Sequence, residues 1–161
     1  GLRQSEPGCK IEVLIPDFQG SREALEKVTA AGPDVINHNM EVVEPLFGRL
    51  RPQGNYHRSL ERLSCIANTG MISKSGFMLG FGEEKADILR LMDDLAAVSC
   101  RRLTIGQYQQ PTLKHWPVAR YYHPDEFAEF KEIAFSKGFE YVESGPLVRS
   151  SYHAADAKTG K

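Results

Sequence analysis

The sequence predicts an α/β fold built on a parallel sheet, and three observations lead to this prediction. Short apolar runs typical of strands alternate four times with longer helical patterns along the 161 residues. The central run, within residues 72–84, leads through glycines into the clearest helical pattern of the chain. Polar residues follow several of the strands, at the end where α/β proteins hold ligands. Four such units form half of a β/α barrel or an open sheet.

The strands are expected where β-branched and aromatic residues cluster between turn formers. Residues 11–15 form the first, which Pro16 and Asp17 stop, and residues 34–37 form the second. The third is the central run of residues 72–80, and the fourth is 102–105. Residues 139–142 are a candidate for a last short strand. The expected strands are therefore short, as in a sheet whose ligand site lies at one end.

Five helices are expected between the strands, at residues 22–31, 42–50, 59–68, 84–98 and 125–136. Ser21 can cap the first helix, and Pro124 opens the last. The fourth carries Ile88, Leu91 and Leu95 at positions i, i+3 and i+7, so this face is expected in the core. Residues 112–123 lack any periodicity and are predicted to form a long ordered loop that covers a site.

Composition excludes several classes of protein. The net charge of −1 provides no general field for nucleic acid or anionic lipid. No apolar run approaches the roughly 20 residues that span a bilayer. The three cysteines are far apart and lack metal-ligand spacing, which favours free thiols in a reducing compartment. Because the opening residues are polar, the chain is expected to begin partway through a longer protein.

Amide and carboxylate side chains gather after the predicted strands. Asn37, Asn39 and Glu41 are suited to ribose hydroxyls or an amino group, although the residues alone favour a turn followed by a helix N-cap at Asn39. Gln107 and Gln110 follow the fourth strand. Asp17 is either a site residue or a turn former. Two further arginines, Arg51 and Arg58, either bind a carboxylate or phosphate or lie in a solvated loop.

Five stretches of the chain are long and irregular: EVLIPDFQG, DVINHNME, SKSGFMLGFGE, LTIGQYQQPTLKHWPV and GFEYVESGPLVRSSYHA. Through them the chain resembles the C-terminal half of the lipoyl synthase family of radical S-adenosylmethionine enzymes. The five stretches are collinear and cover nearly the whole chain. Gly76-x-Met78-x-Gly80-x-x-Glu83 is also similar to the Gly-x-Ile-x-Gly-x-x-Glu pattern that radical S-adenosylmethionine barrels place beside adenine.

The resemblance implies a partial, six-stranded β/α barrel of the TIM type. Residues 1–143 would supply its strands three to six, and residues 144–161 a C-terminal extension with an Arg-Ser-Ser-Tyr motif. It also implies the insertion of two sulfur atoms at carbons 6 and 8 of a protein-bound octanoyl-lysine. The implied cofactors are S-adenosylmethionine and two 4Fe–4S clusters. The cysteine ligands of both clusters lie in the N-terminal half of the family, so this chain by itself is expected to be inactive.

Particular residues acquire roles by the same resemblance. Ser150, the first serine of the motif, would be a catalytic residue and an iron ligand of the auxiliary, sulfur-donating cluster. An oxygen ligand on a cluster otherwise held by thiolates is a plausible labile corner. The S-adenosylmethionine pocket would be lined by Asn37, Asn39, Glu41, Lys74, Gly76, Gly80, Glu83, Gln107 and Gln110.

The implied partners are octanoylated lipoyl carrier domains, namely the acyltransferase subunits of dehydrogenase complexes and the H protein of glycine cleavage. The missing N-terminal half and an electron donor such as flavodoxin or ferredoxin complete the set, with no nucleic acid and no membrane. The expected location is the bacterial cytoplasm, or a mitochondrion or plastid in a eukaryote.

The alternative function is a non-catalytic α/β module that binds a nucleotide or a carrier. A weaker alternative is a hydrolase-like or isomerase barrel fragment with Asp17 or Glu83 as base.

Overall fold

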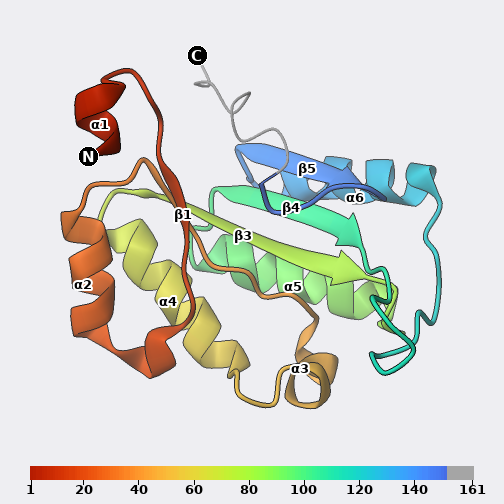
Figure 1. Cartoon of the computed structure of the whole chain (residues 1–161). Helices are drawn as coiled ribbons and strands as arrows, with labels where there is room; N and C mark the ends of the chain where they lie inside the picture. The colour runs from red at the N-terminus through yellow and green to blue at the C-terminus, as the bar shows by residue number, and fades with distance from the viewer. Residues whose placement is uncertain (152–161) are drawn as a thin grey trace.

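A five-stranded, wholly parallel sheet forms the centre of the computed structural model, which describes residues 1–151 (Figure 1). The strands lie side by side in the same order as in the chain, from β1 at one edge to β5 at the other. They are β1 (Glu12–Leu14), β2 (Val35–Asn37), β3 (Ile72–Leu79), β4 (Arg102–Gln107) and β5 (Tyr141–Gly145). The predicted α/β class with a parallel sheet is therefore confirmed.

The five predicted helices are present, with ends that either coincide with the prediction or differ from it by at most three residues. They are α2 (Arg22–Ala30), α3 (Glu44–Leu50), α4 (Tyr56–Asn68), α5 (Lys85–Ala97) and α6 (Pro124–Ser136). Two short turns, α1 (Leu2–Ser5) and the 3₁₀ turn η1 (Phe18–Gly20), were not predicted. The α4 helix begins three residues early because the Asn55 side chain accepts a hydrogen bond from the amide of Arg58 at 2.9 Å.

The sheet is wound in one direction only, and this determines where the helices lie. Crossovers between parallel neighbours are right-handed, so a strand order without reversal sends every connecting helix to the same face. Figure 1 shows α4, α5 and α6 together on one face of the sheet. The core lies between this face and the helices, and Ile36, Phe77 and Leu103 of the strands are buried there. Each such side chain contributes roughly 1.5–3 kcal/mol by burial.

The opposite face carries no helix of the connecting set, and we call it the helix-free face. Register places Asn37 beside Lys74, Gly76 beside Thr104, and Met78 beside Gly106 on adjacent strands. Because residues in register share a face and alternate residues change face, these side chains belong to the helix-free face. It is polar and rich in glycine, which distinguishes it from the apolar core face.

The C-terminal part of the sheet differs from the prediction. The sheet has a fifth full strand that ends at Gly145, so residues 144 and 145 of the predicted extension belong to the sheet. Phe139, expected in that strand, precedes it and is buried in the core instead. Residues 152–161 of the predicted extension, Tyr152 of the motif included, lie outside the described residues. Among residues 1–151, none of the helices combines the length and the apolar character needed to span a bilayer.

Candidate functional site

Two asparagines at the end of β2 supply unsatisfied acceptors beside the helix-free face. Asn37 and Asn39 each have a side-chain Oδ1 that is buried and accepts no hydrogen bond from residues 1–151. The Nδ2 group of Asn39 donates to Glu41 Oε1 at 3.1 Å. A buried polar atom without a partner costs about 1–3 kcal/mol. Both oxygens are therefore suited to a ligand that brings hydroxyl or amino groups.

After the irregular segment of residues 38–40, Glu41 pairs with the central strand β3. Its amide donates to Gly76 O at 3.0 Å, and its carbonyl accepts from the amide of Met78 at 2.9 Å. The backbone of Glu41 is left-handed, with φ of 68°. A residue other than glycine pays a conformational cost for this geometry. The loop is thus fixed by backbone bonds to β3, while the Glu41 carboxylate orients Asn39.

Gly76 lies between the two sides of this site. A side chain there would bring Cβ closer than 3.0 Å to Thr104 Oγ1 and to 3.1 Å from Asn39 Oδ1. Glycine therefore preserves space that any other residue would fill. The predicted importance of Gly76 has a steric basis, and Thr104, which the sequence interpretation did not name, forms the opposite wall.

Gly80 and Glu83 form a closed turn after β3. Glu83 accepts hydrogen bonds from the amides of Gly80 at 2.7 Å and Phe81 at 2.9 Å, one on each carboxylate oxygen. Burial, together with a hydrogen bond to Glu83, raises the pKa of the Tyr122 hydroxyl. Gly80 has φ of 113°, and a Cβ there would clash with Gln107. The Glu83 carboxylate thus holds the turn together.

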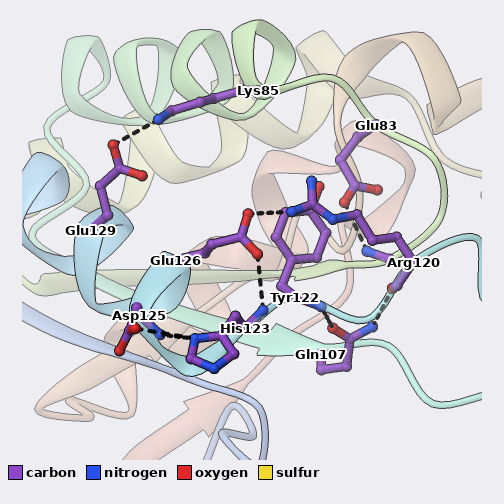
Figure 2. A network of polar contacts seen from close by, with 10 residues as sticks. Glu83, Lys85, Gln107, Arg120, Tyr122, His123, Asp125, Glu126 and Glu129 are labelled. Atoms are coloured by element: carbon purple, nitrogen blue, oxygen red, sulfur yellow. Dashed lines mark hydrogen bonds and ion pairs between the residues drawn. The ribbon is translucent and has the colours of Figure 1, made fainter.

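The two predicted glutamines fasten the loop that follows β4, and Figure 2 shows the contacts of Gln107. Gln107 Oε1 accepts from the amide of Tyr122 at 3.0 Å, and Gln107 Nε2 donates to the carbonyl of Arg120 at 3.0 Å. Gln110 Nε2 donates to His115 O at 2.9 Å. These contacts explain why the predicted long loop is ordered. Their role as cofactor ligands stays a prediction, because the contacts seen are to the protein itself.

Lys74 and Ser150 meet on the helix-free face, although 76 residues separate them. Lys74 Nζ donates to Glu12 Oε1 at 2.8 Å, to Glu12 Oε2 at 3.1 Å and to the carbonyl of Ser150 at 2.6 Å. The predicted cluster ligand therefore lies on the same face as Asn37, Lys74 and Gly76 of the predicted cofactor residues. Glu12 was missed because it lies in the first strand, where only alternation could have placed it on this face.

The two arginines and Asp17 form structural contacts. Arg58 pairs with Asp17, with Nη2 at 2.6 Å from Oδ2. Burial raises the pKa of the Asp17 carboxyl, but the amide of Gln19 and the Arg58 guanidinium outweigh it and leave the pKa below its ordinary value. A carboxylate of lowered pKa is a poor general base. Arg51 Nη1 donates to the carbonyls of Asn39 and Met40, so it holds the segment that carries the Asn39 side chain.

The cysteines do not form a cluster site by themselves. Cys9 precedes β1 and is exposed, Cys65 lies in α4, and Cys100 is buried after α5. Burial raises the pKa of the Cys100 thiol to about 12, so its thiolate is scarce at neutral pH. Within residues 1–151, no group of three or more His, Cys, Asp or Glu is placed to hold a metal ion. The described residues thus fit a polar nucleoside-like ligand but not an iron–sulfur cluster held by this chain alone.

The fold and the helix-free face define a class: a singly wound α/β domain with a candidate polar ligand site beside the ends of its central strands. Comparison with known proteins then indicates the family. Curated lipoyl synthases of Bacteroides fragilis, Roseiflexus sp. and Rubrobacter xylanophilus are 53%, 52% and 50% identical to the chain. These matches cover 95%, 95% and 99% of the chain. The predicted resemblance to the lipoyl synthase family is therefore confirmed.

The coverage of these relatives is as informative as the identity. The chain spans about half of their length, namely 53%, 52% and 51% respectively. No family model matches the chain. Among solved structures, the HMG-CoA lyase of Brucella melitensis is 16% identical, with a TM-score of 0.49 over 87% of this chain and 57% of that chain. A likeness at this score carries no inference about fold or function.

Proposed function

We propose that the chain is the C-terminal part of a lipoyl synthase and contributes one wall of its S-adenosylmethionine site. The observation that carries the proposal is the pair of orphaned oxygens, Asn37 Oδ1 and Asn39 Oδ1, beside the space that Gly76 preserves. A ligand with ribose hydroxyls and an amino group satisfies both acceptors. The identity of about 50% to lipoyl synthases over 95% of the chain supports the same assignment.

The finer fold proposal is a partial barrel of the TIM type, with residues 1–143 as its second half. A parallel sheet whose connecting helices all lie on one face is the arrangement found in β/α barrels, where the helices form the outer ring. The helix-free face would then be the barrel interior. At the β1 edge, an apolar groove lined by Val13, Ile15, Val28 and Pro33 offers a surface for the preceding β/α unit.

The reaction proposed for the complete enzyme is sulfur insertion at carbons 6 and 8 of an octanoyl-lysine. S-adenosylmethionine and a reducing iron–sulfur cluster would supply the radical that removes hydrogen, and an auxiliary cluster would supply the sulfur. The residues of this chain would bind and orient the nucleoside through Asn37, Asn39 and Glu41. The proposed catalytic role of Ser150 is to present an oxygen ligand from the C-terminal extension. Since residues 1–151 contain no group of three or more His, Cys, Asp or Glu that could hold a metal ion, the cluster cysteines would come from the other half.

The partners and the location follow from this reaction. We expect an octanoylated carrier domain, of a dehydrogenase-complex acyltransferase or of the glycine cleavage H protein, as the substrate. A small electron carrier such as flavodoxin or ferredoxin would supply electrons. The bacterial cytoplasm is the expected location, in keeping with the bacterial origin of the relatives compared.

A chimaera tests the proposal. The corresponding part of the Bacteroides fragilis lipoyl synthase is replaced by this chain, the clusters are reconstituted anaerobically, and lipoyl formation on an octanoylated carrier is measured. We expect turnover by the chimaera and none by the isolated chain. Ser150→Ala should abolish both sulfur additions, because the auxiliary cluster would supply both atoms, whereas Ser151→Ala, the matched control one residue away, should leave them intact.

The rival function is a non-catalytic module that binds a nucleotide or a carrier, and the scattered cysteines favour it. Calorimetry with S-adenosylmethionine separates the two functions. Binding by the isolated chain as tight as binding by the chimaera would support the module. An inactive chimaera with both clusters present would overturn the assignment to lipoyl synthase.

A further inference from the structure

Lys74 is buried, and all the hydrogen-bond donors of its ammonium group have acceptors within the protein. Its side chain is 3% exposed, and its three ammonium protons face three acceptors: both carboxylate oxygens of Glu12 and the carbonyl of Ser150. An ammonium group has three donors and no more. Lys74 therefore has no donor left for the cofactor that the family resemblance assigns to it.

The Ser150 carbonyl reaches Lys74 because the chain after β5 crosses the sheet. Val148 is buried, and its carbonyl lies directly over Gly106 of β4. A Cβ at Gly106 would come closer than 3.0 Å to this carbonyl oxygen. The glycine thus admits the crossing segment, residues 146–150, which we call the C-terminal strap. A glycine within a strand commonly marks such a close backbone approach.

We propose that Lys74, held by Glu12, is the positioning residue that fixes the C-terminal strap, and with it Ser150, on the helix-free face. Three facts support this role. The ion pair links β3 to β1, so Lys74 is held from a second strand. The bond to Ser150 O is a charge-assisted hydrogen bond in a buried site, which makes it strong. The bond goes to the backbone carbonyl of Ser150, so the Ser150 hydroxyl oxygen, Oγ, takes no part in it and stays available as a ligand.

Arg149 provides a direct reporter of the strap. Its side chain is exposed, and trypsin cuts the bond between Arg149 and Ser150, the residue whose carbonyl Lys74 holds. A protease needs a segment that can leave the surface and extend. Cleavage at this bond therefore measures release of the strap in the 161-residue chain, without any cofactor.

The test compares four forms of the chain by limited trypsin digestion followed by mass spectrometry. Lys74→Met should raise the rate of cleavage after Arg149 at least about 10-fold, because it removes the charge and keeps the length. Lys74→Arg should restore most of the protection. Lys85→Met, which breaks an exposed ion pair with Glu129 on another face, should leave the rate within about 2-fold of the wild type. Cleavage after the exposed Lys114 serves as the internal control for global unfolding.

A second pair of variants keeps the test decisive if Lys74→Met fails to fold. Gly106→Ala should lift the strap by collision with the Val148 carbonyl and expose the same bond. Gly145→Ala, its partner in register on β5, places Cβ at 3.4 Å from a Val148 methyl group and should be tolerated. Unchanged cleavage after Arg149 in folded Lys74→Met, or in Gly106→Ala, would overturn the proposal.

The functional meaning of the strap rests on the proposed role of Ser150, but the two can fail separately. If Lys74→Met releases the strap while Ser150→Ala leaves the chimaera fully active, the proposed positioning by Lys74 is supported and the proposed role of Ser150 is refuted. If Ser150→Ala abolishes turnover while the strap is equally protected with and without Lys74, the role of Ser150 stands and the positioning by Lys74 falls.

Discussion

Single glycines on the helix-free face decide what can approach it. Gly76 is the clearest case, because Thr104 of β4 and Asn39 of the segment after β2 border the position and leave no room for a methyl group. The same residue type has no such role in α3, where a Cβ on Gly48 meets nothing within 4 Å. The two positions therefore separate the effect of crowding from the effect of backbone freedom.

Gly76→Ala should lower the free energy of unfolding by about 1–3 kcal/mol, the usual cost of overpacking. It should also weaken S-adenosylmethionine binding in the chimaera, because the methyl group fills the space beside Asn39. Gly48→Ala should raise the free energy of unfolding by about 0.5–1 kcal/mol, because alanine favours the helix. Urea titration measures both. Equal effects of the two substitutions would contradict the crowding at Gly76.

Asp34 is a second residue whose surroundings give a measurable expectation. The amide of Ile11 donates to Asp34 at 2.9 Å, and Lys10 and Arg3 lie beside it at 3.0 and 2.9 Å. The bond from the Ile11 amide, more than the two cations, lowers the pKa of Asp34 from 3.8 to about 2. Because the pKa is lowered in the folded state, the ionised group stabilises the fold above about pH 4. This stabilisation is lost as the pH falls toward 2.

Asp34→Asn should therefore cost about 1–2 kcal/mol of unfolding free energy at pH 7. The difference from the wild type should shrink between pH 4 and pH 2. Glu132→Gln on the exposed side of α6 is the control, and it should stay within about 0.5 kcal/mol at both ends. Denaturant midpoints across this pH range provide the measurement. A difference that persists unchanged at pH 2 would argue against the lowered pKa.

At the scale of elements, the loop after β4 depends on one side chain at the end of the strand. Gln107 bonds to the backbone of Arg120 and Tyr122, so a single amide closes a loop of more than ten residues. Trp116 adds a second attachment, because its Nε1 donates to Phe81 O at 3.2 Å. The loop is thus attached near its end through Gln107 and in its middle through Trp116.

Gln107→Leu should release this loop while the sheet stays folded. Trypsin cleavage after Lys114 should accelerate by about 10-fold, because a local opening of lower free energy exposes the bond. Gln109→Leu is the matched control, since Gln109 is exposed and lies two residues further along. Hydrogen exchange of the β3 amides distinguishes release of the loop from general unfolding. Equal cleavage in the two variants would show that Gln107 does not hold the loop.

The elements also show what the sequence could predict. The face of α5 with Ile88, Leu91 and Leu95 is buried as expected, because helical periodicity reflects burial directly. The polar residues at strand ends were placed correctly, but their partners were not. Glu83 and Gln107 contact backbone groups whose position depends on the path of a loop, and no local pattern encodes that path. The fifth strand was cut short for a similar reason, because Glu143, Ser144 and Gly145 lack strand propensity and are held by pairing with β4.

For the whole molecule, the important property is a parallel sheet that has helices on one face only and an edge strand on each side, β1 and β5. Leu14 of β1 is 61% exposed on the helix-free side of one edge. An exposed leucine on an edge strand is a liability in a complete domain, unless another part of the protein covers it. Since the relatives are about twice as long as the chain, the covering part is expected to be their remaining half.

Leu14→Ser tests this expectation by association with the N-terminal half of the Bacteroides fragilis lipoyl synthase. The affinity should fall at least about 10-fold, because burying a leucine contributes about 1.5–3 kcal/mol. The stability of the isolated chain should change by less than about 0.5 kcal/mol. Leu113→Ser, at a loop tip where the side chain is 96% exposed, is the control and should leave the affinity unchanged. Equal affinity of both variants would place the interface elsewhere.

At position 41, the stability of the fold and the function of the site favour different amino acids, because the backbone there is left-handed. Both its backbone groups bond to β3, so the conformation is imposed by the sheet, and glycine or asparagine would adopt it at lower cost. The carboxylate, however, holds the amide of Asn39. A saturation library at codon 41, screened once for thermal tolerance and once for nucleoside capture, should therefore enrich different amino acids in the two screens.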